Sequence, residues 1–189
     1  MPLEYINRKK KAHYVKVSLT KNGKERYYII KDKSKLAESE LLTDMPRGYE
    51  FYEQPEDALV VFRKIVKSSV SKEEMMTVDS VMQELKLPND YIIDRGINEI
   101  NVYLDRFTKK ENKDYFRDNI HLYQYYNLML RFVKSGRNYK AERFCHLLRF
   151  HGWITIETSD DLEFLAKKYC YHINKESLYD FWIEGEEDY

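Results

Sequence analysis

This sequence has few cysteines and no long apolar run, and both features bear on the compartment in which the protein is expected. The chain has two cysteines in 189 residues, Cys145 and Cys170, which are too few for the disulfide framework of a secreted domain. No stretch approaches the ~20 apolar residues of a membrane-spanning helix, and no apolar run follows the basic residues 8 to 11, as a secretory signal requires. We therefore expect a cytoplasmic protein with buried thiols and no membrane partner.

Glycine and proline are also few, at six and four residues, which argues against a long flexible linker. Neither sign of charge dominates, since 32 basic residues balance 32 acidic ones. This balance excludes a uniformly basic nucleic-acid protein and a polyacidic one. A content of 43% hydrophobic and 15% aromatic residues is enough to build a core. The length fits one domain or two small ones.

The sequence lacks the common signatures of cofactor binding: a glycine-rich phosphate loop, a G-x-S-x-G elbow and an H-E-x-x-H helix. We predict no cofactor. Histidine and cysteine do cluster towards the end of the chain, yet their spacing does not suit a metal. Cys145 and His146 are adjacent, so on a strand they point to opposite faces, and Cys170 and His172 are separated by roughly 200° on a helix. We expect core cysteines, surface histidines and no metal site.

Two enzyme hypotheses stay open. Cys145 could act as the nucleophile of a hydrolase, with His151 or His172 as its base, if the fold brings them together. Carboxylates such as Asp94, Glu99 and Glu142 could serve a metal-dependent nuclease, although nothing in their spacing selects them. We favour the hypothesis that the protein has no catalytic activity.

Residues 1 to 68 are predicted to form a small basic antiparallel module. Val15, Val17 and Leu19 alternate with polar residues, as in a half-buried strand. Asn22-Gly23 then predicts a two-residue hairpin turn. Further strand patterns follow, so that we expect a four-stranded meander from residues 14–19, 25–31, 49–53 and 59–66, with a helical or irregular crossover over 34–43.

Residues 69 to 189 are predicted to form a second module of strands and helices. Ser71 and Glu74 make a capping box, and the helix that they open ends before Pro88. Strand patterns follow over residues 91–94, 97–104, 128–132, 139–147 and 153–156. The stretch 105–126 fits either a helix or a loop. The fold class is thus α+β, an N-terminal antiparallel meander followed by a mixed antiparallel-strand and helix module, and whether the two modules pack as one unit stays open.

The end of the chain is predicted to be helical. Thr158 or Ser159 caps one helix, with acidic residues in its first turn. Asn174 caps a last helix, which Gly185 ends before an acidic tail at residues 186 to 189.

Three short patches resemble a group of uncharacterised bacterial conserved proteins with no established function. They are residues 46–53 (PRGYEFYE), residues 142–145 (ERFC) with 152–154 (GWI), and residues 165–169 (LAKKY) with 175–179 (KESLY). They follow one order over most of the chain. The resemblance implies that both modules belong to one arrangement, and it implies no catalytic residue.

The charges are unevenly distributed along the chain. Residues 1 to 35 hold eleven basic and three acidic side chains, whereas residues 157 to 189 hold ten acidic ones and three lysines. The first hairpin interleaves lysine and arginine with tyrosine, which is the composition that grips phosphates and stacks bases. Its candidate nucleic-acid-binding residues are Lys16, Lys24, Arg26, Tyr14 and Tyr28.

Three functions follow from these patterns. The leading hypothesis is a non-catalytic protein that acts through a protein partner or a homo-oligomer, because 17 tyrosines and 9 phenylalanines exceed what a small core hides. The alternative is single-stranded nucleic-acid binding through the basic hairpin, and the third is a hydrolase of unknown class. An equally simple account of the charge asymmetry is attraction between the two ends, within or between chains.

Overall fold

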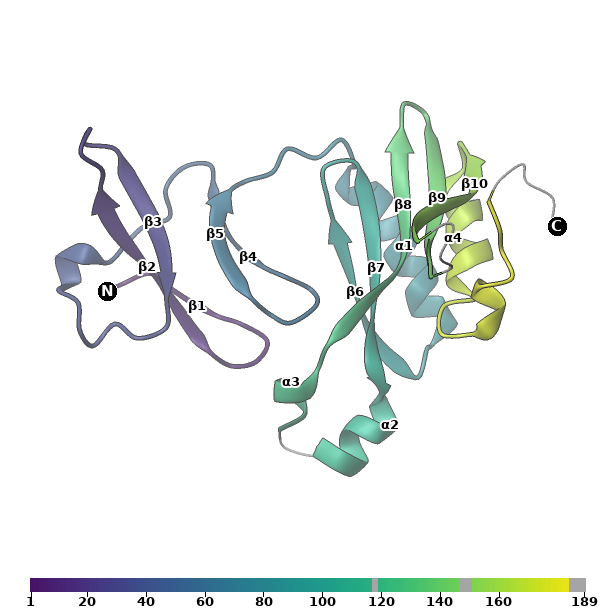
Figure 1. Cartoon of the computed structure of the whole chain (residues 1–189), viewed down its shortest axis with the longest axis horizontal. Coiled ribbons are helices and arrows are strands. Elements are labelled where there is room, and N and C mark those ends of the chain that lie inside the picture. Colours follow the sequence, from purple (N-terminus) through teal and green to yellow (C-terminus); the bar gives the residue numbers. More distant parts are fainter. Residues whose placement is uncertain (117–118, 147–150, 184–189) are drawn as a thin grey trace. The chain divides into compact units, whose positions relative to one another are not determined.

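The computed structural model describes residues 1–116, 119–146 and 151–183. The chain forms two compact units. Unit 1 comprises Met1–Ile65 and Phe116–Gln124, and unit 2 comprises Val66–Tyr115 and Tyr125–Tyr189. Antiparallel sheets and helices make up the fold, so the predicted α+β class with an N-terminal antiparallel meander is confirmed (Figure 1).

Unit 1 contains two small sheets. The first has the order β1-β2-β3 and the second pairs β4 with β5, so the single four-stranded sheet predicted here is wrong. The sequence also gave no sign of β1, which has only three residues. The elements are β1 (Glu4–Ile6), β2 (Ala12–Leu19), β3 (Glu25–Ile30), the 3-10 turn η1 (Glu38–Glu40), β4 (Tyr49–Glu53), β5 (Val60–Lys64) and α3 (Ile120–Tyr123).

Aromatic packing, not a shared ladder, joins the β4–β5 hairpin to β3. The Tyr27 ring on β3 lies 5.0 Å from Tyr49 and 5.4 Å from Phe62, both edge to face. Phe62 also meets Phe51 at 5.1 Å. Such ring pairs stabilise a core beyond the area that they bury. The β4-β5 hairpin therefore packs its rings against the Tyr27 face of β3.

The β2–β3 turn differs from the predicted two-residue turn. Leu19 pairs with Glu25 at the last position of the ladder, and the Thr20 amide donates to the Lys24 carbonyl. The loop thus has one more residue, and Gly23, with φ 73°, takes the left-handed position. A turn followed by a left-handed glycine is the usual three-residue hairpin connection. Its effect is to leave Lys21 in the loop, without a cross-strand partner.

Unit 2 is built on one five-stranded antiparallel sheet in the order β10-β9-β8-β7-β6. The helices α1 and α4 pack against each other and cover one face of this sheet (Figure 1). Among the described residues, no helix has the length and apolar content needed to cross a membrane. The main elements are α1 (Lys72–Leu85), β6 (Asn89–Arg95), β7 (Glu99–Thr108), β8 (Tyr126–Ser135), β9 (Asn138–Cys145), β10 (Gly152–Ser159) and α4 (Leu162–Cys170).

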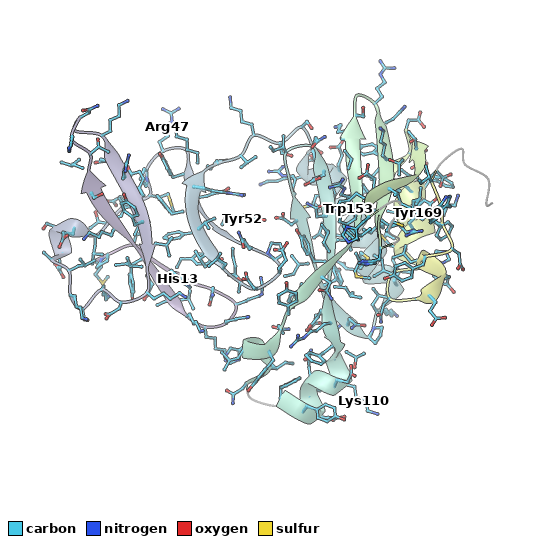
Figure 2. The ribbon with its side chains drawn as sticks, viewed as in Figure 1. His13, Arg47, Tyr52, Lys110, Trp153 and Tyr169 are labelled. Atoms are coloured by element: carbon cyan, nitrogen blue, oxygen red, sulfur yellow. The ribbon has the colours of Figure 1, made fainter. Side chains whose placement is uncertain are left out.

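The two faces of this sheet differ. Phe132 and Leu165 are fully buried between the sheet and the helices, together with Tyr169 of α4. On the opposite face Trp153 packs edge to face against Phe144 at 5.6 Å, under the Arg131 guanidinium. Figure 2 labels Trp153 on β10 and Tyr169 on α4. The alternation predicted for strands 97–104 and 128–132 is the one that produces this division.

Two predicted helix ends are corrected. The N-cap of α4 is Asp161, whose carboxylate accepts from the Phe164 amide, and neither Thr158 nor Ser159 takes that role because β10 continues to Ser159. The last predicted helix is only the 3-10 turn η4 (Glu176–Leu178), which follows Asn174 in a left-handed conformation. The predicted strand residue Leu147, the predicted helix end Gly185 and the acidic tail lie outside the described residues.

The stretch 105–126 is neither one helix nor one loop. It begins as the end of β7 and continues as a short helical turn, α2 (Lys109–Glu111), and a π-helical turn, η2 (Asn112–Phe116). Thr108 and Glu111 make a capping box at its start. After α3, Tyr126 already belongs to β8. Short turns of this kind leave no long apolar period in the sequence.

The predicted capping box at the start of α1 is present, and Glu74 extends it to the sheet. Its carboxylate accepts from the Ser71 amide at 2.7 Å, from Lys134 at 2.5 Å and from the Tyr139 hydroxyl. Burial alone would raise the pKa of Glu74, but these hydrogen bonds outweigh it and hold the pKa below its ordinary value. Glu74 thus ties α1 to β8 and β9.

This arrangement predicts a pH-dependent contribution to stability. Because the pKa of Glu74 is lowered by folding, its contribution is present above its ordinary pKa of 4.5 and is lost as the pH falls through the folded-state pKa. We expect Glu74→Gln to lower the free energy of unfolding by about 1 to 2 kcal/mol at neutral pH and by less in acid. Urea unfolding at both pH values measures this, with the exposed Glu84→Gln as control. An equal loss at both would contradict it.

Candidate nucleic-acid interface

The β2–β3 hairpin presents most of the predicted site residues on one face. In its ladder Lys16 lies opposite Tyr28, and Ser18 lies opposite Arg26. Directly opposed residues of an antiparallel pair point to the same side of the sheet. We call this surface, with Lys21 and Lys24 at the turn, the hairpin face.

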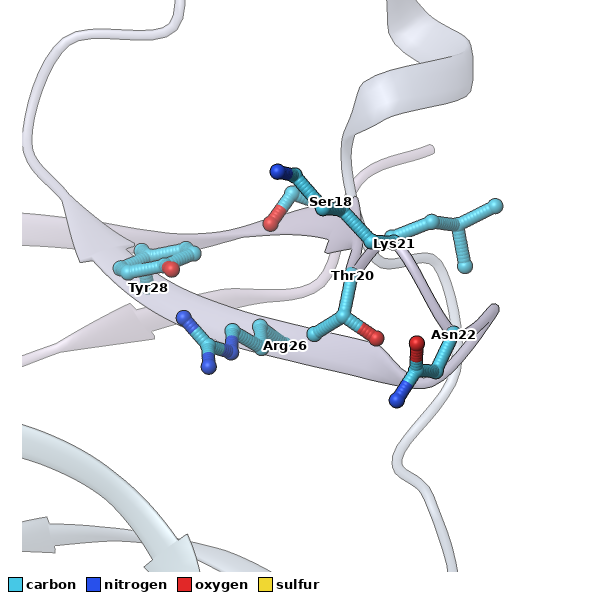
Figure 3. Close-up of a pocket in the computed structure, with 7 residues that line it drawn as sticks. Ser18, Thr20, Lys21, Asn22, Arg26 and Tyr28 are labelled. Carbon is cyan, nitrogen blue, oxygen red and sulfur yellow. The ribbon is translucent and has the colours of Figure 1, made fainter.

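A shallow pocket of about 440 Å³ lies on the hairpin face near the turn. Figure 3 shows the Arg26 and Lys21 side chains extending back from the turn, the guanidinium of Arg26 towards the Tyr28 ring and Lys21 beside Ser18. Asn22 and Thr20 close the pocket at the turn. Two cations and one aromatic ring therefore surround a space that is open to a ligand.

The groups that would contact a ligand are exposed. Tyr28 keeps 48% of its surface accessible, and Lys21, Lys24 and Arg26 are exposed as well. Among the described residues, none of these three cationic side chains has a carboxylate partner. Their charges are available to an anion that approaches the hairpin face.

Lys16 is less available than the sequence predicts. Its ammonium lies 3.1 Å from the Glu40 carboxylate on η1, and its side chain is 33% accessible. The hydrogen bond from Lys16 is the main cause of a lowered pKa of Glu40. An exposed ion pair of this kind is weak, so a phosphate can compete with Glu40, but Lys16 contributes less net charge than the lysines of the turn.

Tyr14 cannot act as the predicted stacking ring. Only 8% of its surface is accessible, its hydroxyl donates to Glu4, and the Lys33 ammonium covers its ring at 4.4 Å. Tyr27 lies on the opposite face, where its ring packs against Tyr49 and its hydrogen bond to Glu25 raises its pKa to about 12. Tyr28 is therefore the tyrosine that the hairpin face exposes.

The chemistry considered for other parts of the chain does not gather into a site. Cys145 and Cys170 are 1% and 0% accessible, and burial raises the pKa of Cys170. Glu142 is held by Arg131 at 2.6 Å and by Thr155. Within the described ranges, no group of three or more His, Cys, Asp and Glu residues could hold a metal ion. A sealed thiol cannot reach a substrate, which leaves the Cys145 hypothesis without support.

Sequence reasoning missed Ser18 and Lys21, which line the pocket. The alternation that starts at Tyr14 places Ser18 on the hairpin face, so Ser18 could have been predicted from the sequence. The position of Lys21 depends on the length of the loop, and the Asn-Gly pair predicts a loop that is one residue too short.

No protein-family model, curated protein or solved structure matches this chain. The similarity to uncharacterised bacterial proteins stays a prediction, and the role of the hairpin face rests on its geometry.

Proposed function

We propose that unit 1 binds single-stranded nucleic acid through the hairpin face. The observation that carries this proposal is the juxtaposition of an exposed Tyr28 ring with Arg26 and Lys21, two exposed cations, around one pocket. A base stacks on an exposed aromatic ring in single strands of any sequence, while cations alongside hold the phosphates. A flat ring beside charges at a hairpin turn suits an unpaired strand better than a duplex, whose bases are stacked already.

The salt dependence of the affinity separates the contribution of the cations from that of the Tyr28 ring. Binding of a labelled oligothymidylate of about 12 nucleotides is followed by fluorescence anisotropy at several salt concentrations. If Lys21, Lys24 and Arg26 each neutralise a phosphate, the slope of log K against log salt is about −2, and Arg26→Ala moves it towards zero by about 0.7. Tyr28→Ala weakens binding by about 10-fold at every salt concentration and leaves the slope unchanged.

Matched controls come from exposed residues outside the hairpin face. Lys35→Ala removes a charge from a neighbouring loop, and Tyr115→Ala removes a ring that is 78% accessible. Lys35→Ala should change the affinity less than Arg26→Ala does, and Tyr115→Ala should change it less than Tyr28→Ala does. Absence of binding at low salt, or equal effects of Arg26→Ala and Lys35→Ala, would rule out the hairpin face as the binding surface.

Protein contact is the second candidate function, and exposed aromatic residues favour it. Tyr171 and Tyr179 of unit 2 are 54% and 51% accessible, and Phe164 on α4 is 45% accessible. Aromatic side chains that stay in water on a free chain are typical of interface centres. Light scattering of the purified protein over a concentration series tests for self-association. A monomer at every concentration would leave a different protein as the partner.

A further inference from the structure

Two neighbouring strands of the unit 2 sheet separate at one end. The ladder between β8 and β9 stops at the pair Leu130–Arg143. Beyond that pair β8 continues beside β7, and β9 continues beside β10 (Figure 1). The register of β7 and β8 shifts at Met129, where β8 has one extra residue. A bulge of this kind bends its strand, so the sheet divides between β8 and β9.

A pocket of about 430 Å³ occupies this division. Leu128 and Met129 of β8, Phe144 of β9 and Leu178 of η4 give it apolar walls. The volume is in the range of pockets that hold small molecules, and such sites combine apolar walls with a few polar groups that orient the ligand.

The most buried polar residue that lines this pocket is Arg143, with only 2% of its surface accessible. Its Nε donates to the Phe181 carbonyl at 2.7 Å, and its Nη atoms donate to the carbonyls of Phe144 and Tyr179. Each Nη atom carries a second N–H, and for these no partner occurs among the described residues.

No carboxylate pairs with Arg143 in the described part of the chain. Its hydrogen-bond partners there are three neutral carbonyl oxygens, and the rings of Tyr179 and Trp182 lie 5.8 and 5.9 Å from the guanidinium, so the described residues bring no negative charge to it. A buried charge in that state is costly, and an anion that reaches it gains a strong interaction in a low-dielectric setting.

The rim of the pocket adds polar groups that can hydrogen-bond to an anion. Asn127 and Tyr179 are exposed there, and so is His146. We propose that the pocket between β8 and β9 binds a small organic anion, with a phosphate or carboxylate group on Arg143 and an apolar body against Leu128, Met129 and Phe144.

Phenyl phosphate is the probe, and calorimetric titration of the full chain is the measurement. We expect binding with a dissociation constant below about 1 mM. Inorganic phosphate, which lacks the apolar body, and phenol, which lacks the charge, should each bind at least about 10-fold more weakly. No binding of phenyl phosphate up to about 10 mM would overturn the proposal. Equal affinities for phenyl phosphate and inorganic phosphate would overturn the apolar part of it.

A rim variant tests the location without removing Arg143, which also supports the fold. Asn127→Asp places a negative charge at the mouth of the pocket and should weaken phenyl phosphate binding about 10-fold. Asn138→Asp is the matched control, since Asn138 is exposed at the opposite end of the β8–β9 ladder. Equal effects of the two variants would overturn the assignment of the site.

Discussion

Replacement of Phe132 by alanine is expected to lower the free energy of unfolding by about 3 to 5 kcal/mol. The ring is fully buried on β8, the middle strand of the unit 2 sheet, where it lies in the core between the sheet and the helices. Its removal loses the transfer free energy of the ring and leaves a cavity that close-packed neighbours fill only in part. Urea unfolding followed by circular dichroism measures the loss.

Phe164→Ala is the matched control for this prediction. The same atoms are removed, but Phe164 lies on the outer side of α4 and is 45% accessible. The free energy of unfolding should fall by less than about 1 kcal/mol. If the two variants lost the same stability, Phe132 would not be a core residue and the sheet register given above would be wrong.

The second large effect is expected from Arg143→Met. Methionine replaces the apolar stem of arginine but leaves three carbonyl oxygens without their donor, and two of these belong to the C-terminal segment at Tyr179 and Phe181. Hydrogen bonds from a charged donor contribute more than neutral ones, and carbonyls left without a donor add a penalty. We expect a loss of about 3 kcal/mol in the free energy of unfolding.

The control is Lys140→Met on the same strand, because Lys140 is exposed. Its replacement should change the free energy of unfolding by less than about 0.5 kcal/mol. The near-ultraviolet circular dichroism of Trp182, whose ring lies 5.9 Å from the Arg143 guanidinium, should change only in Arg143→Met. An unchanged spectrum together with unchanged stability would show that Arg143 does not hold the C-terminal segment.

Strands and caps with a local cause could be predicted from the sequence. Val15 and Val17 alternate because one side of β2 faces a core, and Ser71 and Glu74 satisfy each other's backbone amides without help from distant residues. The bounds of β4 are the predicted residues 49 to 53. Such features depend on neighbours along the chain, which the sequence displays.

The candidate site depends on contacts between residues that are distant in the sequence, and fewer of its features could be predicted. Tyr14 and Tyr28 follow the same alternation and share a side of the ribbon, but Glu4 and Lys33 bury one of them and leave the other in water. Glu40 pairs with Lys16 from a turn more than twenty positions away. Periodicity assigns a side chain to a face of a strand, and it does not show what covers that face.

Arg143 shows the same limit in unit 2. Its position in the alternation of β9 marks it as a side chain of the covered face, yet an arginine there gives no hint of its partners. The bulge at Met129 opens the pocket, and no glycine or proline lies near it in the sequence from which it could be predicted. A pocket formed by a shift in register is therefore invisible until the strands are paired.

The interleaving of the two units bears on how the chain matures during synthesis. The chain leaves unit 1 after Ile65, returns to it at Phe116 and leaves it again after Gln124. A ribosome adds about 5 to 20 residues per second, so the first 65 residues wait several seconds for the segment that completes their unit. Unit 2 waits longer, because β8 to β10 and α4 come last. A fragment cut at residue 65 would reproduce the nascent intermediate and not the finished unit 1.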